Sequence, residues 1–318
     1  MITRREFGFL TVAGLVGVRL KSDGTYRPLH AMGASSTING VHLGVQTYSF
    51  RDLPRPAGAA DSVDVVINAM TTCGLTECEL FSPQIEPQFS SGARGARGAP
   101  PSPEAVKARE DLRKWRLETP IAHFQAVRKK FDAAGIAIYA FCHNMNTSFT
   151  DAEIDRGFAI AKALGAQVMT TSTTLEVARR IAPIADAHRM NIGMHGHSNV
   201  TDPNEFATPD SFAAAMKMSR YFKVNLDIGH FVSADFDPVA YIKAHHADIT
   251  NLHVKDRKKH QGDNTPWGEG DTPIREVLQL LKKERWPIPA YIEYEYRGAG
   301  TPVDEVKKCF EFEKRALA

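Results

Sequence analysis

The stretch VNLDIGHFVSADFDPVAYIKAHHADITNLHVKD, residues 224–256, predicts a strand, a helix and a second strand. The apolar runs Phe222–Ile228 and Ile249–Val254 are typical of buried strands, with a helical pattern at Pro238–His246 between them. A connection of this length indicates a parallel pair, because antiparallel neighbours need only a short turn. Since the C-terminal ends of parallel strands face the same rim, we expect the polar residues that end both strands to meet there.

Those polar residues are candidate metal ligands. Asp227 and His230 close the first strand, and His253, Lys255 and Asp256 close the second. A carboxylate and an imidazole at adjacent strand ends suit a divalent cation. Each residue alone also has a simpler interpretation, in which Asp227 caps a loop and His253 is a hydrogen-bonded core histidine. Their occurrence at matching strand ends favours a metal site.

Composition places the chain among ordinary globular proteins. It has 318 residues, 43% hydrophobic and 24% charged, with a formal net charge of +2. That is enough apolar material for a large core. The balanced charge gives no support to nucleic-acid binding, and the four cysteines lack zinc-ribbon spacing.

The N-terminus resembles an export signal. Residues 3–7, TRREF, match the twin-arginine motif, and the apolar run Phe7–Val18 that follows is too short to span a bilayer. We therefore expect residues 1–33 to be a signal segment and linker, and the protein to be periplasmic or secreted without stable membrane insertion. A basic, weakly apolar tail is the alternative.

From residue 41 onward, strand and helix patterns alternate. The expected strands are Val41–Thr47, Thr76–Phe81, Ile136–Phe141, Gln167–Thr171, Asn191–Met194, Phe222–Ile228, Ile249–Val254 and Ala290–Tyr296. The expected helices are Ser62–Thr72, Pro103–Leu117, Pro120–Ala134, Asp151–Leu164, Leu175–His188, Pro209–Ser219, Pro238–His246, Ile274–Lys283 and Val303–Lys314. This regularity predicts an α/β fold, a single (β/α)₈ barrel over residues 41–318. No glycine-rich nucleotide loop follows a strand.

Ionisable side chains recur where the expected strands end. They are Glu79, His143, His195, His197, Asp227, His230, His253, Lys255, Glu293 and Glu295. Carboxylates gathered without a cation would repel and raise one another's pKa. A divalent metal removes that conflict and polarises a bound oxygen, which begins much carbonyl chemistry.

Three of these elements resemble a known family. Residues 226–230 (LDIGH), 253–256 (HVKD) and 292–295 (IEYE) are similar to motifs of the sugar phosphate isomerase/epimerase family. These xylose isomerase-like barrels include ketose 3-epimerases, inosose dehydratase and, more distantly, endonuclease IV, and the resemblance covers roughly residues 41–316. It implies that one divalent ion (manganese, magnesium, cobalt or zinc) is held by Asp227, His253 and Glu293, with His230 touching the substrate.

The sequence departs from the ketose epimerases at one ligand. Their fifth strand usually ends in a glutamate that binds metal and moves protons, whereas here His195 stands at that place, with His197 two residues later. Either imidazole can bind a metal or act as a base near neutral pH. We expect His195 to be the fourth ligand and Glu293, His197 or Glu295 to be the proton-transferring group.

Further residues are candidates for substrate binding. Lys255 is expected to donate to substrate oxygens, and His143 to contact substrate or support a ligand. Glu79 is expected to hold a substrate hydroxyl or a histidine. Trp267 stacks on a sugar ring or packs within its loop, and Glu269 is functional or lies in a solvated turn.

These observations predict a divalent-metal-dependent isomerase or epimerase of a sugar or sugar derivative. The reaction would proceed by proton abstraction next to a carbonyl, through a metal-stabilised enediolate. A lyase or dehydratase of keto-sugars or keto-glycosides is the main alternative, followed by a non-catalytic sugar-binding barrel and an endonuclease IV-like nuclease. Export favours unphosphorylated carbohydrates as substrates. A homo-oligomer is compatible with the sequence.

Overall fold

The structure is a computed structural model that describes residues 36–90 and 100–318. The predicted signal at residues 1–33 lies outside these residues, so twin-arginine export and a periplasmic or secreted location stay predictions. Among the described helices, none is both long enough and apolar enough to cross a membrane.

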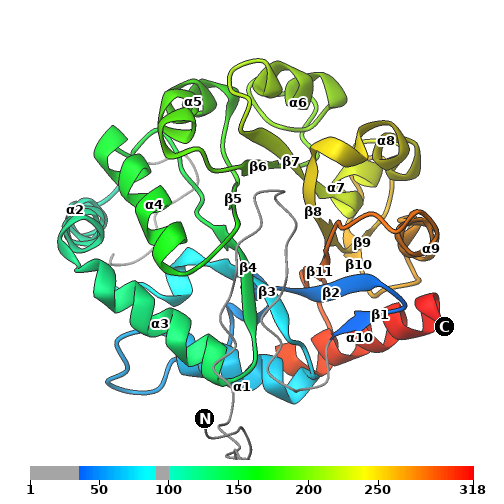
Figure 1. Ribbon diagram of the computed structural model, residues 1–318, viewed down its shortest axis with the longest axis horizontal. Helices are drawn as coiled ribbons and strands as arrows, with labels where there is room; N and C mark the ends of the chain where they lie inside the picture. Colours follow the sequence, from blue (N-terminus) through cyan, green and yellow to red (C-terminus); the bar gives the residue numbers. More distant parts are fainter. Residues whose placement is uncertain (1–35, 91–99) are drawn as a thin grey trace, which may run out of the picture. The chain divides into compact units, whose positions relative to one another are not determined.

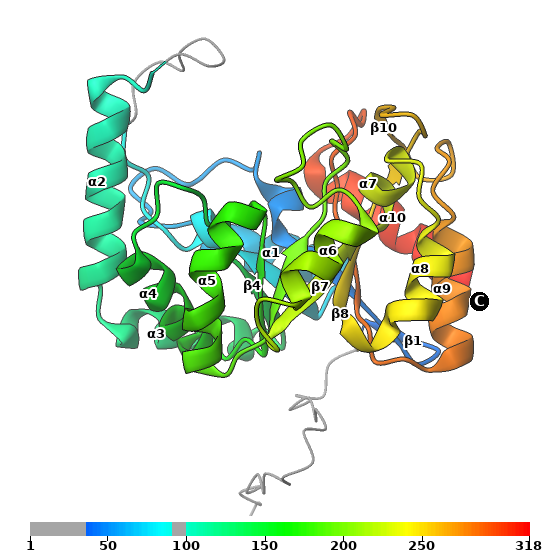
Figure 2. The same cartoon turned by 90° about the horizontal axis from the view of Figure 1, so that it is seen from above.

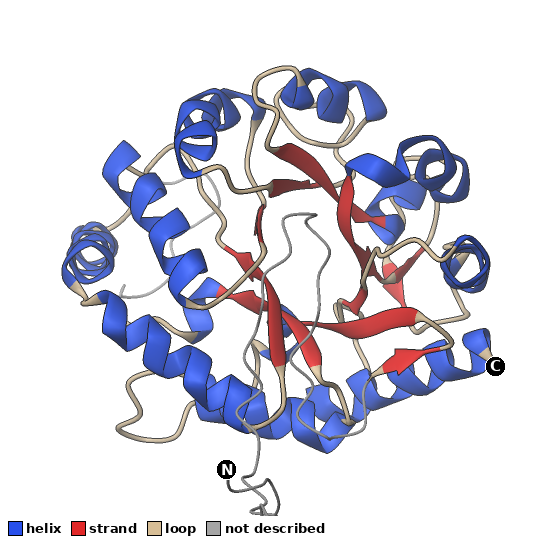
Figure 3. Ribbon diagram, viewed as in Figure 1, coloured by secondary structure: helices blue, strands red, loops and turns tan. Residues whose placement is uncertain are grey.

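Within the described residues, eight parallel strands close into a barrel (Figures 1 and 3). In order around the ring they are β2 (Val41–Gln46), β3 (Glu77–Phe81), β4 (Ala137–Cys142), β5 (Val168–Thr171), β6 (Ile192–His195), β7 (Phe222–Asp227), β8 (Ile249–Val254) and β11 (Ala290–Ile292). β11 pairs with both β8 and β2, and β2 pairs with β3, which closes the ring. The predicted single-domain (β/α)₈ fold is confirmed.

Helices form a layer outside the strands (Figure 3). They are α1 (Val63–Cys73), α2 (Pro103–Glu118), α3 (Ile121–Ala133), α4 (Asp151–Ala163), α5 (Leu175–His188), α6 (Pro209–Met216), α8 (Pro238–His245), α9 (Ile274–Glu284) and α10 (Pro302–Leu317). α9 shows the usual pattern, because Val277, Leu278 and Leu281 form a buried apolar face at helical spacing. The long α2 has no buried residue and is held through ion pairs such as Arg116 Nε to Glu86 Oε1 at 2.8 Å.

Several short elements were not predicted. They are β1 (Thr37–Ile38), α7 (Ile228–Ser233), β9 (Asp256–Arg257), β10 (Asn264–Thr265), and the 3₁₀ turns η1 (Thr47–Phe50), η2 (Ser82–Gln84) and η3 (His246–Asp248). α7 and β10 lie at the same end of the barrel (Figure 2). β7 ends at Asp227 because that side chain caps α7, its Oδ1 accepting the backbone N–H of His230 at 2.7 Å.

The last barrel strand is shorter than predicted. It ends at Ile292, although the sequence pattern continues to Tyr296. Beyond it, side chains take up the backbone groups of Tyr294, whose N–H donates to Ser49 Oγ at 2.9 Å. Its carbonyl accepts from Arg51 Nη1, also at 2.9 Å. Glu293 and Glu295 therefore stand on an irregular segment just past the sheet.

The N-terminal end of the barrel is filled by a large aromatic side chain. Tyr291 is fully buried, and its Oη donates to Glu77 Oε1 at 2.7 Å. A Cβ atom at Gly44 would lie 2.7 Å from this ring, so glycine is needed for the close approach. The strands are thus packed together below the site, independently of the polar residues at the other end.

Candidate metal centre

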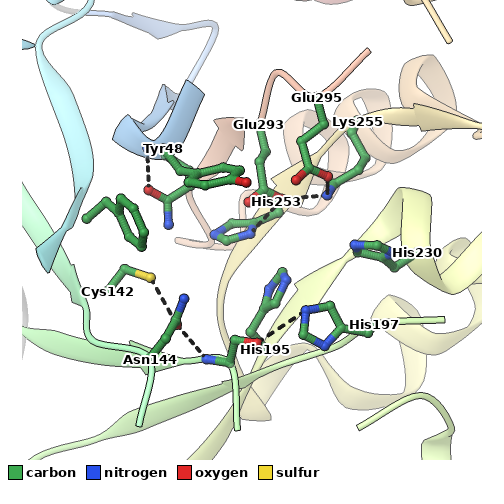
Figure 4. Close-up of a pocket in the computed structure, with 13 residues that line it drawn as sticks. Tyr48, Cys142, Asn144, His195, His197, His230, His253, Lys255, Glu293 and Glu295 are labelled. Atoms are coloured by element: carbon green, nitrogen blue, oxygen red, sulfur yellow. Dashed lines mark hydrogen bonds and ion pairs between the residues drawn. The ribbon is translucent and has the colours of Figure 1, made fainter. Parts of the chain in front are cut away.

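A cavity of about 300 Å³ opens at the C-terminal ends of the strands (Figure 4). Its lining consists of Gln46, Tyr48, Phe81, Cys142, Asn144, Ser172, His195, His197, His230, His253, Lys255, Glu293 and Glu295. These residues end or follow seven of the barrel strands or belong to α7, so the fold brings together side chains that are far apart in sequence. Of the nine histidines and carboxylates predicted at strand ends, six line this cavity: His195, His197, His230, His253, Glu293 and Glu295.

Four of the predicted residues form a compact ligand set. One ligand atom from each of His195, Asp227, His253 and Glu293 lies within 4.8 Å of the others, and all four residues are buried. Asp227 Oδ2, His253 Nδ1 and Glu293 Oε2 make no hydrogen bond to any residue that the structure describes. Buried polar atoms normally have such partners. Two carboxylates and two imidazoles whose ligand atoms converge fit a divalent cation.

Lys255 lies against this set. Its Nζ is 2.9 Å from Asp227 Oδ2 and 2.7 Å from Glu293 Oε2, which are ion-pair contacts without hydrogen-bond geometry. A third carboxylate, that of Glu295, also contacts the ammonium group. Lys255 is almost fully buried, so its charge is balanced mainly by these neighbours.

Glu79 forms a hydrogen bond with His253 on the side of the ring that faces away from the other ligands. Glu79 Oε2 lies 2.9 Å from His253 Nε2 and 2.7 Å from the donating Asn251 Nδ2. Its Oε1 accepts from Gln46 Nε2 at 2.7 Å and from Thr170 Oγ1 at 2.6 Å. Because the Glu79 carboxylate accepts, Nε2 of His253 carries a proton, and Nδ1, which lies 3.2 Å from Glu293 Oε2, is the ring atom that faces the other ligands. Glu79 has no exposed surface, so the structure places it in the supporting role that the sequence left open.

His195 is oriented in a similar way. Its Nδ1 lies 2.9 Å from Asn225 Oδ1, while the amide nitrogen of Asn225 donates to the Asn251 carbonyl at 3.4 Å. This assigns the proton of His195 to Nδ1 and leaves Nε2 as the ligand atom. The His195 and His253 rings are 4.7 Å apart, close enough to share one ion.

The buried ionisable groups shift one another's pKa values. Burial, with a contribution from Glu293, raises the pKa of Asp227 to about 7 although Lys255 opposes this. Burial also acts against ionisation of Glu293, but Lys255 and His253 outweigh it and hold that pKa well below its usual value. The two carboxyls compete for one ammonium ion, and a divalent cation would hold both ionised.

The predicted acid–base and substrate residues divide into two groups. His197, His230, Lys255 and Glu295 line the cavity with the ligands (Figure 4). His197 lies between two polar partners, its Nε2 3.2 Å from Ser172 Oγ and its Nδ1 3.2 Å from Glu205 Oε1. Burial lowers the pKa of His197, which favours the neutral imidazole.

The structure does not bring His143, Trp267 or Glu269 to the cavity. His143 alternates with the cavity-lining Cys142 and Asn144, and its ring stacks on Phe141 at 5.5 Å. It is 1% exposed, and burial lowers its pKa well below the usual value.

Trp267 packs edge-on against Phe312 at 5.8 Å, and Glu269 is exposed. Their loop folds back on Asp256, whose carboxylate accepts the backbone N–H groups of Gly268, Gly270 and Thr272. The predicted substrate roles of these two residues and of His143 therefore have no support from the geometry.

Sequence reasoning missed an aromatic wall. The rings of Tyr48 and Phe81 meet edge-on with centroids 5.1 Å apart, and both line the cavity. Each follows or ends a barrel strand, which is the signal that identified the charged residues. Aromatic residues at such positions look like core residues in a sequence, so the pattern did not single them out.

The sequence profile of the xylose isomerase-like TIM barrel family matches residues 104–315. L-ribulose-5-phosphate 3-epimerase UlaE of Escherichia coli is 26% identical over 172 residues, which are 52% of this chain and 60% of that protein. The matched region thus spans less than two thirds of that relative.

Two solved structures have a similar fold. A sugar phosphate isomerase/epimerase from Parabacteroides distasonis is 17% identical with a TM-score of 0.56, covering 94% of this chain and 99% of that chain. The IOLI protein, solved with a bound zinc atom, is 12% identical with a TM-score of 0.59, covering 86% and 97%. At these identities the likeness is one of fold.

Proposed function

Because the chain belongs to the family of xylose isomerase-like TIM barrels, we propose that it is a divalent-metal-dependent isomerase or epimerase of a small sugar. One observation carries the proposal: ligand atoms of Asp227, His253 and Glu293 that make no hydrogen bond to a described residue converge beside a cavity with room for a small molecule. His195 completes the set. A noncatalytic structural site would not need this opening beside the ligands.

The residues around the ligand set supply binding and proton transfer. A divalent ion bound there polarises carbonyl oxygens as a Lewis acid. Tyr48 and Phe81 offer an apolar wall for the carbon face of a sugar, and Lys255 and His230 offer donors for its oxygens. Glu293 and His197 face the same cavity and are the candidate groups for removing and returning a proton next to the carbonyl. Glu295, bound to Lys255, is the third candidate.

The charges of the lining favour a substrate without a phosphate group. In the described lining, Lys255 is the single lysine or arginine, and three carboxylates already contact its ammonium group. A phosphate dianion in this cavity would lie near Glu293 and Glu295 with no uncommitted lysine or arginine of the lining to pair with it, because the proposed divalent ion is surrounded by its own ligands. This argument agrees with the predicted export and separates the proposed substrate from that of the named epimerase.

A lyase or dehydratase reaction is the second candidate. It is favoured by the asymmetry between Glu293 on one side of the ligand set and the imidazoles of His195 and His197 on the other. Symmetrical epimerisation uses matched groups on both faces of the substrate. A carboxylate base opposite an imidazole acid suits removal of a proton at one carbon and departure of a hydroxyl or alkoxyl from its neighbour.

Solvent exchange tests the proposal. The metal-loaded protein is incubated in D₂O with a panel of ketoses and keto-glycosides, and deuterium next to the carbonyl is followed by NMR and mass spectrometry. Exchange with at least one compound is expected, and Glu293→Gln should lower its rate by about 10²- to 10⁴-fold. Glu311→Gln, an exposed change on α10, is the matched control.

The products distinguish the candidate functions. Exchange with a change of configuration or carbonyl position supports the isomerase or epimerase. Loss of water or of the glycosidic group supports the lyase. Tight sugar binding without any exchange would identify a sugar-binding barrel, and cleavage of abasic-site DNA would identify the nuclease.

A further inference from the structure

Two possible ligand sets share His195. One is the set described above, and the other consists of His195, His197 and His230, whose ligand atoms also lie within 4.8 Å of one another. Both border the same cavity, so distance alone allows a second ion. The hydrogen bonds behind each imidazole decide which nitrogen atoms are available to a metal.

The partner of His230 is a guanidinium group. Arg257 Nη1 lies 2.6 Å from His230 Nδ1. A guanidinium group only donates hydrogen bonds, so Nδ1 must accept, and the proton of a neutral imidazole then lies on Nε2. This is the opposite of His195, whose Nδ1 faces the carbonyl oxygen of Asn225. His195 offers a lone pair to the cavity, whereas His230 offers an N–H group.

Arg257 is itself held in place. Its Nε and Nη2 donate to the Gly262 carbonyl at 3.2 and 2.7 Å, and Nη1 also reaches Ser198 Oγ at 3.1 Å. Its backbone belongs to β9, which pairs with β10. These three donor contacts, made from a paired strand, leave the guanidinium little freedom to turn away from His230.

The N–H group of His230 is directed toward the proposed metal centre. Its Nε2 lies 4.0 Å from Asp227 Oδ2, one of the unpaired ligand atoms, and its backbone N–H donates to the other oxygen of the same carboxylate. The ring borders the cavity (Figure 4). A substrate oxygen beside Asp227 would therefore meet a donor.

We propose that Arg257 is a positioning residue that keeps His230 a hydrogen-bond donor and prevents it from binding a metal ion. With Nε2 of His230 protonated and Nε2 of His195 serving the four-residue set, the three-imidazole cluster holds no ion of its own, and the rim takes a single divalent ion at His195, Asp227, His253 and Glu293. The donor role toward substrate rests on the proposed function, whereas the tautomer does not.

Imidazole ¹⁵N NMR tests the tautomer without metal or substrate. The His230 signals, assigned by their loss in His230→Ala, should show protonated Nε2 in the wild type. Arg257→Met should give the Nδ1–H form or a mixture, and Arg257→Lys, which keeps a donor, should restore the wild-type form. Arg220→Met, an exposed change before β7 at the other end of the barrel, should leave the signals unchanged. Protonated Nδ1 in the wild type, or identical spectra in Arg257→Met, would overturn the proposal.

Zinc stoichiometry tests the consequence. By calorimetry and elemental analysis the wild type should bind one Zn²⁺ per chain, and Arg257→Met should also bind one, because His195 Nε2 serves the four-residue set and cannot hold a second ion. Two ions in the wild type would overturn the proposal. With a turned-over substrate, Arg257→Met should raise KM about tenfold, the size expected for one lost hydrogen bond. Failure to find turnover would count against the proposed function and leave the NMR results to decide the role of Arg257.

Discussion

The two ends of the barrel bury polar groups in different ways. At the N-terminal end, Tyr291 Oη donates to Glu77 Oε1 at 2.7 Å, and the second oxygen of Glu77 lies 3.4 Å from His42 Nδ1. At the C-terminal end, Asp227 Oδ2 and Glu293 Oε2 find no hydrogen bond within the described parts of the chain. Both ends are buried, so the contrast lies in the kind of contact. The groups at the N-terminal end are hydrogen-bonded, whereas the proposed ligand atoms are held by ion-pair contacts with Lys255 and keep their hydrogen-bonding capacity.

Removing a metal ligand at the C-terminal end is expected to have the largest effect of the changes considered, on both metal binding and turnover. Asp227→Asn or His253→Ala is expected to lose the bound divalent ion and with it nearly all turnover, because the set is reduced to three donors. Thermal unfolding should still be cooperative, since the barrel interior is packed separately. Elemental analysis after metal loading provides the measurement, with Glu311→Gln as the unaffected control. Full metal content in both variants would falsify the assignment of the centre.

Substitution of His195 distinguishes a role as metal ligand from a role in proton transfer. His195→Glu should retain one ion and shift the preference toward manganese or magnesium, because a carboxylate is a harder ligand than an imidazole. Competition between zinc and manganese, read by calorimetry, provides the check. If His195 moves protons instead of binding the ion, the variant keeps its metal preference while turnover falls by about 10²- to 10⁴-fold.

The strand ends were predictable because apolar runs stop where the barrel rim begins. That pattern identified His195, Asp227, His253 and Glu293, and the structure gathers all four. It failed at His143, because Phe141, Cys142 and His143 end a strand in succession and the sequence does not show which of them faces inward.

The supporting partners were harder to predict. Glu79 and His253 are 174 positions apart, and His195 and Asn225 are 30 apart. Pairing of β6 with β7 places His195 beside Asn225, whereas closure of the barrel is needed to bring Glu79 on β3 to His253 on β8. Arg257 has no distinguishing signal in the sequence, because its role comes from the turn between β9 and β10. Tertiary contacts, and not local propensity, set the protonation of each ligand.

At the N-terminal end of the barrel, removing the hydroxyl group of Tyr291 should lower the stability of the fold without changing metal binding. Tyr291→Phe leaves the Glu77 carboxylate without its closest donor, which should cost about 1–3 kcal/mol of unfolding free energy. Metal content and affinity should match the wild type. Urea unfolding with and without added metal separates the two effects. A large loss of metal affinity in Tyr291→Phe would show that the two ends of the barrel are coupled.

The last expected effect depends on pH and concerns Glu313 on α10, a buried carboxyl that lies outside the four-residue ligand set. Both of its oxygens lack a hydrogen-bond partner among the described residues, and burial raises its pKa well above the usual value. A carboxyl whose pKa is raised on folding stabilises the fold fully below the unfolded pKa of about 4.3, and this contribution is lost as the pH rises through the folded value. Glu313→Gln removes that titration, so the variant and the wild type should be equally stable near pH 4.

At pH 8 the Glu313→Gln variant should be the more stable by about 1–3 kcal/mol, because the wild type must either keep a proton on Glu313 or bury an unpaired charge. Urea unfolding across this pH range measures the difference, with Glu311→Gln on the exposed side of the same helix as the control. A stability gap that stays constant with pH would mean that Glu313 finds a partner in solution. A stability difference between Glu313→Gln and the wild type that appears only with added metal would mean that Glu313 takes part in metal binding.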